Sequence, residues 1–200
     1  MTAPLRFWLI WTALAIAIGI PLIASAFSPL LAWRSPVYII AGLAGVIALA
    51  LLLVQPLLAG GVLPGLAVLR ARRIHRWIGA GLVLAVAVHV GALWITSPPD
   101  VIDALLLASP TPFSLWGVIA MWAVLATALL ALLRRPFGLR PRSWRLAHAT
   151  LALVIVGATI PHALLIDGTM EPVSKAALCL LVAVATLRTI AGLRLFRRSG

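Results

Sequence analysis

Apolar residues fill most of the chain in long runs, and polar residues collect between these runs. A run of about 20 apolar residues is long enough to cross a hydrocarbon core of about 30 Å as an α-helix. The sequence therefore predicts an all-α fold, an integral membrane six-helix bundle, in which residues 1–200 form a single domain. The six predicted spans lie at about 7–26, 37–58, 74–96, 114–133, 144–166 and 173–193.

Two of these spans show no feature that indicates chemistry. The second span contains glycines, a glutamine and a proline, which we interpret as signs of close helix packing and of a kink. The fourth span has no ionisable side chain and is interpreted as a packing helix. In the connection before the fourth span, the apolar piece Ala104–Ala108 is predicted to form a short interfacial helix. The glycines, the glutamine and the proline of the second span are Gly42, Gly45, Gln55 and Pro56.

Composition excludes a soluble globular domain, because 64% of the residues are apolar and only four are acidic. A net charge of +12 would indicate a nucleic-acid partner in a soluble protein. Here the arginines stand in short clusters between apolar runs, so we interpret them as topology signals and expect a lipid bilayer, with no nucleic acid, as the surrounding partner. The single cysteine, Cys179, lies within an apolar run and offers neither a disulfide framework nor a cysteine metal site.

An even number of spans places both termini on the same side of the membrane. Charge is distributed unevenly between this side and the opposite one. Fourteen of the sixteen basic residues fall on the side of the termini, whereas Arg34, Lys175 and all four acids fall on the other. The positive-inside rule then predicts a multi-pass protein of the cell (inner) membrane with both termini in the cytoplasm. The fourteen are Arg6, Arg70, Arg72, Arg73, Arg76, Arg134, Arg135, Arg140, Arg142, Arg145, Arg188, Arg194, Arg197 and Arg198, and the acids are Asp100, Asp103, Asp167 and Glu171.

The first span resembles a signal peptide in one respect, because residues 24–26 read Ala-Ser-Ala after an apolar run. We favour an uncleaved helix, since an apolar stretch of about 20 residues is long for a signal peptide. Trp8 and Trp11 also fit an interfacial aromatic belt. Cleavage would leave the orientation of the remaining spans unchanged.

All four histidines lie in the third and fifth spans, as two equal pairs. His75 and His89 are fourteen residues apart, and so are His148 and His162. On an α-helix this spacing is about 40° short of four turns and about 21 Å of rise, so each pair projects from one face. Because both spans run in the same direction, His75 is expected level with His148 and His89 level with His162. Two histidines at one height on neighbouring helices are what a bis-imidazole iron site requires.

A lone histidine in a membrane helix usually hydrogen-bonds a neighbouring helix, but two matched pairs favour a ligand role. Zinc would require further ligands, and the spans offer no carboxylate or thiolate at these heights. Haem needs only two axial histidines, and small residues one turn away, such as Gly79 and Ala152, would let a flat porphyrin approach.

Basic and aromatic residues near the inner pair have two interpretations each. Arg73, Arg76 and Arg145 can bind haem propionates, or equally the headgroups of lipids. Trp77, Trp94 and Trp144 are interpreted as belt residues rather than as electron relays. We assign no catalytic residue.

The run His75-Arg-Trp-Ile-Gly79, with a second histidine fourteen residues after the first and another spaced pair two helices later, resembles the ferric reductase-like transmembrane domain. That superfamily includes ferric reductases, NADPH oxidases and the haem subunit of a bacterial methionine sulfoxide reductase system. The resemblance implies a six-helix domain with two b-type haems, the inner iron on His75 and His148 and the outer iron on His89 and His162. The chain departs from the large enzymes because it lacks a phosphate-binding glycine fingerprint, so we expect no FAD or NAD(P) site within it.

The leading hypothesis is a haem-b-containing membrane oxidoreductase component that is ferric reductase-like. Electrons would come from a separate cytoplasmic flavin reductase or from quinol, and would leave to an outer acceptor such as ferric ion or a redox protein. One alternative is a non-enzymatic haem-binding subunit of a separate redox enzyme. Another is a small permease, which would need polar groups converging near the midplane, and few are present besides the histidines. The donor, the acceptor, the oligomeric state and the reduction potentials stay open.

Overall fold

The computed structural model describes residues 2–192, and within this range it contains seven α-helices and no strand. Six of the helices are long and apolar enough to cross a membrane, and the seventh, α4, is short. The prediction of an all-α membrane bundle with six spans is therefore confirmed. The elements are α1 (Ala3–Ala26), the 3-10 turn η1 (Pro29–Leu31), α2 (Pro36–Ala59), α3 (Val68–Thr96), α4 (Pro98–Leu105), α5 (Pro112–Leu133), α6 (Pro141–Leu165) and α7 (Pro172–Gly192).

Proline marks the start of most helices, because its missing N–H costs no hydrogen bond in the first turn. Helix α3 begins at Val68, six residues before the predicted span at about 74–96, so Arg70, Arg72 and Arg73 lie on a helix. The predicted position of the short helix is wrong. The short helix is Pro98–Leu105 instead of Ala104–Ala108, because prolines start it early and the chain turns at Leu107, whose φ is 58°.

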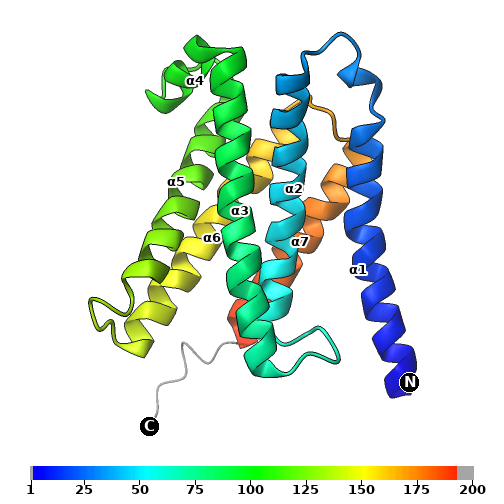
Figure 1. The fold of residues 1–200 in the computed structure, drawn as a ribbon, viewed down its shortest axis with the longest axis vertical. Coiled ribbons are helices and arrows are strands. Elements are labelled where there is room, and N and C mark those ends of the chain that lie inside the picture. Colours follow the sequence, from blue (N-terminus) through cyan, green and yellow to red (C-terminus); the bar gives the residue numbers. More distant parts are fainter. Residues whose placement is uncertain (1, 193–200) are drawn as a thin grey trace.

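The helices pack as two hairpins joined by a common neighbour. Helix α3 packs along α2, and α6 packs along α5, while α7 contacts both α2 and α6 (Figure 1). Helix α1 lies at the edge of the bundle, against α2 and α7. The main apolar core draws on both hairpins and on α7, for example through Leu53, Leu82, Val124, Ile155 and Val182.

The two ends of the bundle differ in charge. The start of α1 and the end of α7 lie at one end, and α4 lies at the other (Figure 1). Since consecutive spans alternate in direction, the arginines beside the α2–α3 and α5–α6 connections share the end where α1 starts. We call this the arginine-rich end, and the opposite one, which carries the acids, the acidic end. Arg194, Arg197 and Arg198 lie outside the described residues.

Glu171 and Lys175 make hydrogen bonds that stabilise the connection between α6 and α7 at the acidic end. The Glu171 carboxylate accepts the backbone N–H groups of Ser174 and Val173, each at 2.7 Å. These bonds hold the pKa of Glu171 below its usual value and place a negative charge at the start of α7. Lys175 is buried, and its Nζ donates to the carbonyl of Ile166 at 2.8 Å. Lys175 is therefore part of the packed structure and not a free surface charge.

Candidate functional site

The four histidine rings meet in two pairs, each with one ring from α3 and one from α6. The ring centres of His75 and His148 are 6.1 Å apart, with planes crossing at 64°. Those of His89 and His162 are 6.3 Å apart, with planes crossing at 81°. The two levels are separated by about 21 Å along α3. The structure thus brings together all four histidines that the sequence singles out, in the expected partnership.

The ring spacing suits one metal between each pair. A metal–imidazole bond is about 2.0 Å and the ligating nitrogen lies about 1.1 Å from the ring centre, so two imidazoles on one metal have centres about 6.2 Å apart. Among residues 2–192, no three His, Cys, Asp or Glu side chains gather at a metal-binding distance. Haem fits this donor set, because it would need only two further ligands from the protein, and each histidine pair could provide them.

Helices α3 and α6 face each other mainly through side chains. Each packs its backbone closely against another helix, α3 against α2 and α6 against α5 and α7. Midway between the two histidine levels, Leu82 of α3 and Ile155 of α6 are buried in the same core cluster. Apolar side chains therefore lie between the two imidazole pairs.

The pair near the acidic end, His89 and His162, is fixed by backbone carbonyls of neighbouring helices. Nδ1 of His89 lies 2.7 Å from the carbonyl oxygen of Ala41 on α2, and Nδ1 of His162 lies 2.8 Å from that of Phe113 on α5. A carbonyl can only accept, so each Nδ1 carries the proton and donates it. Nε2 of each ring is then the unprotonated nitrogen that can bind a metal.

A glycine lies four residues after each of these carbonyls, directly beneath the ring. A Cβ atom on Gly45 would lie 3.1 Å from Nδ1 of His89, and one on Gly117 would lie 2.7 Å from Nδ1 of His162. The interpretation of the second and fourth spans as chemically silent is therefore wrong, since α2 and α5 supply both the acceptor and the space for a ring. A backbone carbonyl that accepts a hydrogen bond cannot be recognised from the residue type at its position. The glycines by themselves resemble ordinary packing residues.

The pair near the arginine-rich end, His75 and His148, is held differently. Nδ1 of His75 lies 3.3 Å from the backbone carbonyl of Gln55. The Gln55 amide is best satisfied with its nitrogen 2.6 Å from the same Nδ1 and its oxygen accepting from the Gly79 N–H at 2.8 Å. The carbonyl would accept a hydrogen bond from Nδ1 of His75, whereas the amide nitrogen would donate one to it. Gln55 therefore positions this ring but does not determine which of its nitrogens carries the proton. The sequence alone does not connect Gln55 with His75, because the two residues lie on different helices.

His148 has a stacking partner in place of a hydrogen bond. Its Nδ1 is buried and has no hydrogen-bond partner among the described residues. The Trp144 ring, one turn earlier on α6, lies 5.1 Å away with planes only 14° apart. The guanidinium carbon of Arg134 lies 4.2 Å from the centre of the Trp144 ring. Trp144 thus has a contact that an interfacial-belt role alone does not explain, whereas Trp77 is 74% exposed.

The arginines proposed from the sequence lie near the His75/His148 pair in the chain, at the surface of the protein. Arg73, Arg76 and Arg145 are all exposed. Arg145 donates from Nε to the carbonyl of Pro141 at 3.3 Å. For the part of the chain that is described, no hydrogen bond joins these three to a histidine ring, and their binding of propionates stays a prediction.

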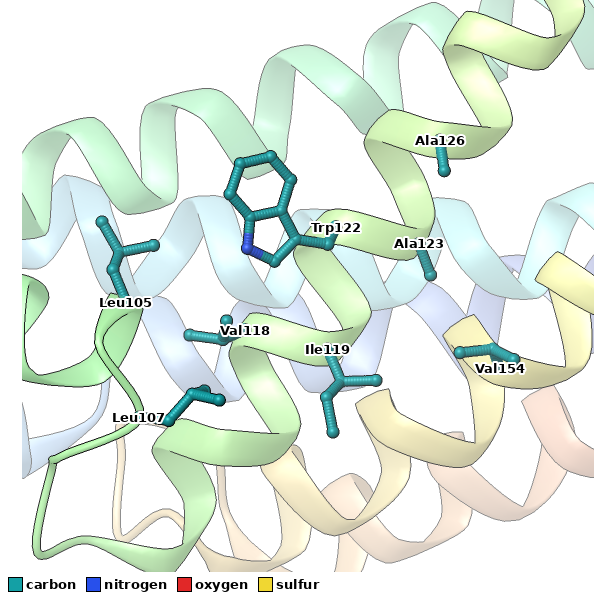
Figure 2. A pocket seen from close by; sticks show the side chains of 8 residues that line it. All are labelled: Leu105, Leu107, Val118, Ile119, Trp122, Ala123, Ala126 and Val154. Atoms are coloured by element: carbon teal, nitrogen blue, oxygen red, sulfur yellow. The ribbon is translucent and has the colours of Figure 1, made fainter.

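An apolar pocket of about 440 Å³ lies apart from the histidines, where the end of α4 meets α5 and α6 (Figure 2). Leu105, Val118, Trp122 and Val154 are among its lining residues, and none of its lining side chains is charged. It therefore offers no ligand for a metal, and the two histidine pairs are the candidate site.

Comparison with protein families gives one match. A family model described as "Ferric reductase like transmembrane component" matches residues 41–159, more than half of the chain. The matched segment contains His75, His89 and His148 and ends shortly before His162. Comparisons with curated proteins and with solved structures give no match.

The seating of His162 predicts that Gly117→Ala destabilises the protein. The new Cβ, 2.7 Å from Nδ1, must push the ring away from the Phe113 carbonyl. Such overpacking costs about 1–3 kcal/mol, whereas replacing glycine by alanine within a helix otherwise gains up to about 1 kcal/mol. Thermal unfolding of the purified protein in detergent measures the difference.

Gly157→Ala is the matched control, because a Cβ at this position on α6 meets open space. It should leave stability unchanged or raise it slightly. If Gly117→Ala were as stable as Gly157→Ala, the close seating of His162 against α5 would be contradicted.

Proposed function

Because this chain belongs to the family of ferric reductase like transmembrane components, we propose that it is a membrane electron-transfer protein whose two histidine pairs hold two b-type haems. The observation that carries this proposal is the spacing of the rings, 6.1 Å and 6.3 Å between centres, at two levels of the same two helices. This spacing suits two axial imidazoles on one iron. Both the family and the donor set support haem over a metal ion held by protein ligands alone.

The residues of the chain have distinct roles in this proposal. His89 and His162 present Nε2 toward the metal, because the carbonyls of Ala41 and Phe113 hold their Nδ1 protons. His75 and His148 form the second ligand pair. When bound, a b-type haem supplies a one-electron Fe(III)/Fe(II) couple whose potential depends on its ligands and burial. Two such sites about 21 Å apart along the membrane normal divide an insulating layer into shorter electron transfers.

The charge difference between the two ends supports an orientation. The arginine-rich end lies in the cytoplasm in this proposal, following the positive-inside rule. The His75/His148 pair is then the inner site, and His89/His162 is the outer site. Arg73, Arg76 and Arg145 contact haem propionates or lipid headgroups beside the inner site.

The direction of electron flow follows from this orientation. Electrons enter at the inner site from a separate flavin reductase or from quinol, and they leave at the outer site to ferric ion or a redox protein. The arginine-rich end attracts an acidic donor protein, because its charges share one sign. The acids at the opposite end, including Asp100 and Glu171, attract ferric ions or a basic acceptor protein.

Alanine substitutions of the histidines test the two haem sites separately. His75→Ala or His148→Ala should remove the inner haem, and His89→Ala or His162→Ala the outer haem, so each variant should retain about half of the wild-type haem. Haem extraction and reduced-minus-oxidised absorbance measure this content, with circular dichroism as the control for folding. A folded quadruple alanine variant that keeps the wild-type haem spectrum would falsify the assignment.

Reporter fusions test the orientation. A reporter that is active only in the cytoplasm should be active when fused after Gly200, because most basic residues share the side of the termini. A reporter that is active only outside the cytoplasm should be inactive at the same position. The opposite result, in protein whose first span is shown to be intact, would reverse the two sides and exchange the inner and outer sites.

Sealed vesicles of known orientation test transmembrane transfer. A donor added on the cytoplasmic side should reduce an impermeant acceptor that is trapped on the opposite side, because the two sites span the membrane. Vesicles with His89→Ala protein are the matched control and should transfer at least tenfold more slowly. If the haems of the wild type become reduced but no electrons reach the trapped acceptor, while the detergent-solubilised protein still reduces it, the transmembrane role is wrong.

A further inference from the structure

His148 differs from the other three histidines in how its ring is held. Nδ1 of His75, His89 and His162 each lies within 3.3 Å of a backbone carbonyl on a neighbouring helix. Nδ1 of His148 is buried without a partner in the described part of the chain. A ligating histidine usually donates its second N–H to a carbonyl or carboxylate, which fixes the ring and increases its electron donation. Another interaction must orient His148.

Trp144 supplies that interaction from the same helix. It lies four residues before His148, so one turn of α6 brings the two side chains to the same face. The rings stack with 14° between their planes and 5.1 Å between their centres. The Trp144 ring is half-buried, and its Nε1 is also buried without a hydrogen-bond partner in the described residues. Its position is therefore set by stacking and not by a hydrogen bond.

Arg134 adds a positive charge to this stack. Its guanidinium carbon is 4.2 Å from the centre of the indole ring, a cation–π distance. Arg134 lies at the end of α5, and Trp144 lies in the first turn of α6, so the contact closes the α5–α6 connection beside His148. A guanidinium stays charged at all physiological pH values, which makes this charge a constant feature of the site.

We propose that Trp144 and Arg134 are positioning residues for His148 and that together they raise the reduction potential of the inner haem. The proposal rests on the haem-binding function proposed above. Trp144 fixes the plane of an imidazole that no hydrogen bond fixes. The positive charge of Arg134 favours the state of the site that holds one more electron. An imidazole without an Nδ1–H acceptor is also a weaker donor to ferric iron, which shifts the potential in the same direction.

Redox titration of the purified full chain tests the role of Arg134. The inner haem is identified as the one that His148→Ala removes. In Arg134→Gln both haems should remain bound, and the ratio of ferrous to ferric inner haem at a fixed ambient potential should fall about three- to tenfold. The outer haem should not change, because it lies at the other level of the bundle. Arg135→Gln, the adjacent exposed arginine, is the matched control and should leave both haems unchanged.

Electron paramagnetic resonance of the oxidised protein tests the role of Trp144. Trp144→Leu should broaden or shift the low-spin signal of the inner haem, because the His148 ring loses its fixed plane, and Trp144→Phe should largely restore it. Trp77→Leu, which removes an exposed tryptophan two residues after His75, should leave the signal unchanged.

The outcomes separate this inference from the function on which it rests. An unshifted inner potential in Arg134→Gln, or an inner signal in Trp144→Leu identical to that in Trp77→Leu, with two haems bound in each case, would overturn the inference alone. Wild-type protein that binds no haem would overturn the proposed function and the inference together.

Discussion

The hydrogen bond from a histidine Nδ1 to a backbone carbonyl of the next helix is the interaction on which the rest of this structure depends. A buried imidazole N–H group in a membrane is costly unless it donates to an acceptor inside the protein, because the hydrocarbon offers none. His89 meets this need on α2, and His162 meets it on α5. Each bond joins the two helices of one hairpin, so the same contact stabilises the fold and leaves Nε2 available at the site.

The carbonyl acceptors impose a steric condition on the helices that carry them. A ring that donates to the carbonyl of residue i covers the surface near residue i+4 of the same helix, where a side chain would collide with it. Gly45 and Gly117 occupy these positions. The closeness of α2 to α3 and of α5 to α6 is thus linked to the positions of the His89 and His162 rings.

The two histidine levels differ in how their rings are held. The outer pair has short carbonyl bonds on both rings and one defined tautomer. The inner pair combines a longer contact from Gln55 on His75 with a stacked tryptophan on His148. If the two levels hold haems as proposed, these differences would give the haems different potentials, because ligand basicity and nearby charge are the means by which a protein adjusts a haem potential. Most of the described arginines lie at the arginine-rich end, on the side of the His75/His148 level.

The sequence by itself determined the six spans, the charge difference between the ends and the matching of His75 with His148 and His89 with His162. These features come from local or periodic signals, which can be recognised in the sequence alone. The signals are the apolar runs, the prolines at helix starts and the spacing of fourteen residues on parallel helices. Only the tertiary structure decided which groups hold the rings: the carbonyls of Ala41 and Phe113, the glycines beneath the rings, Gln55, and Arg134 beside Trp144. These partners depend on which helices are neighbours and how each is rotated, and a backbone carbonyl leaves no mark in the sequence.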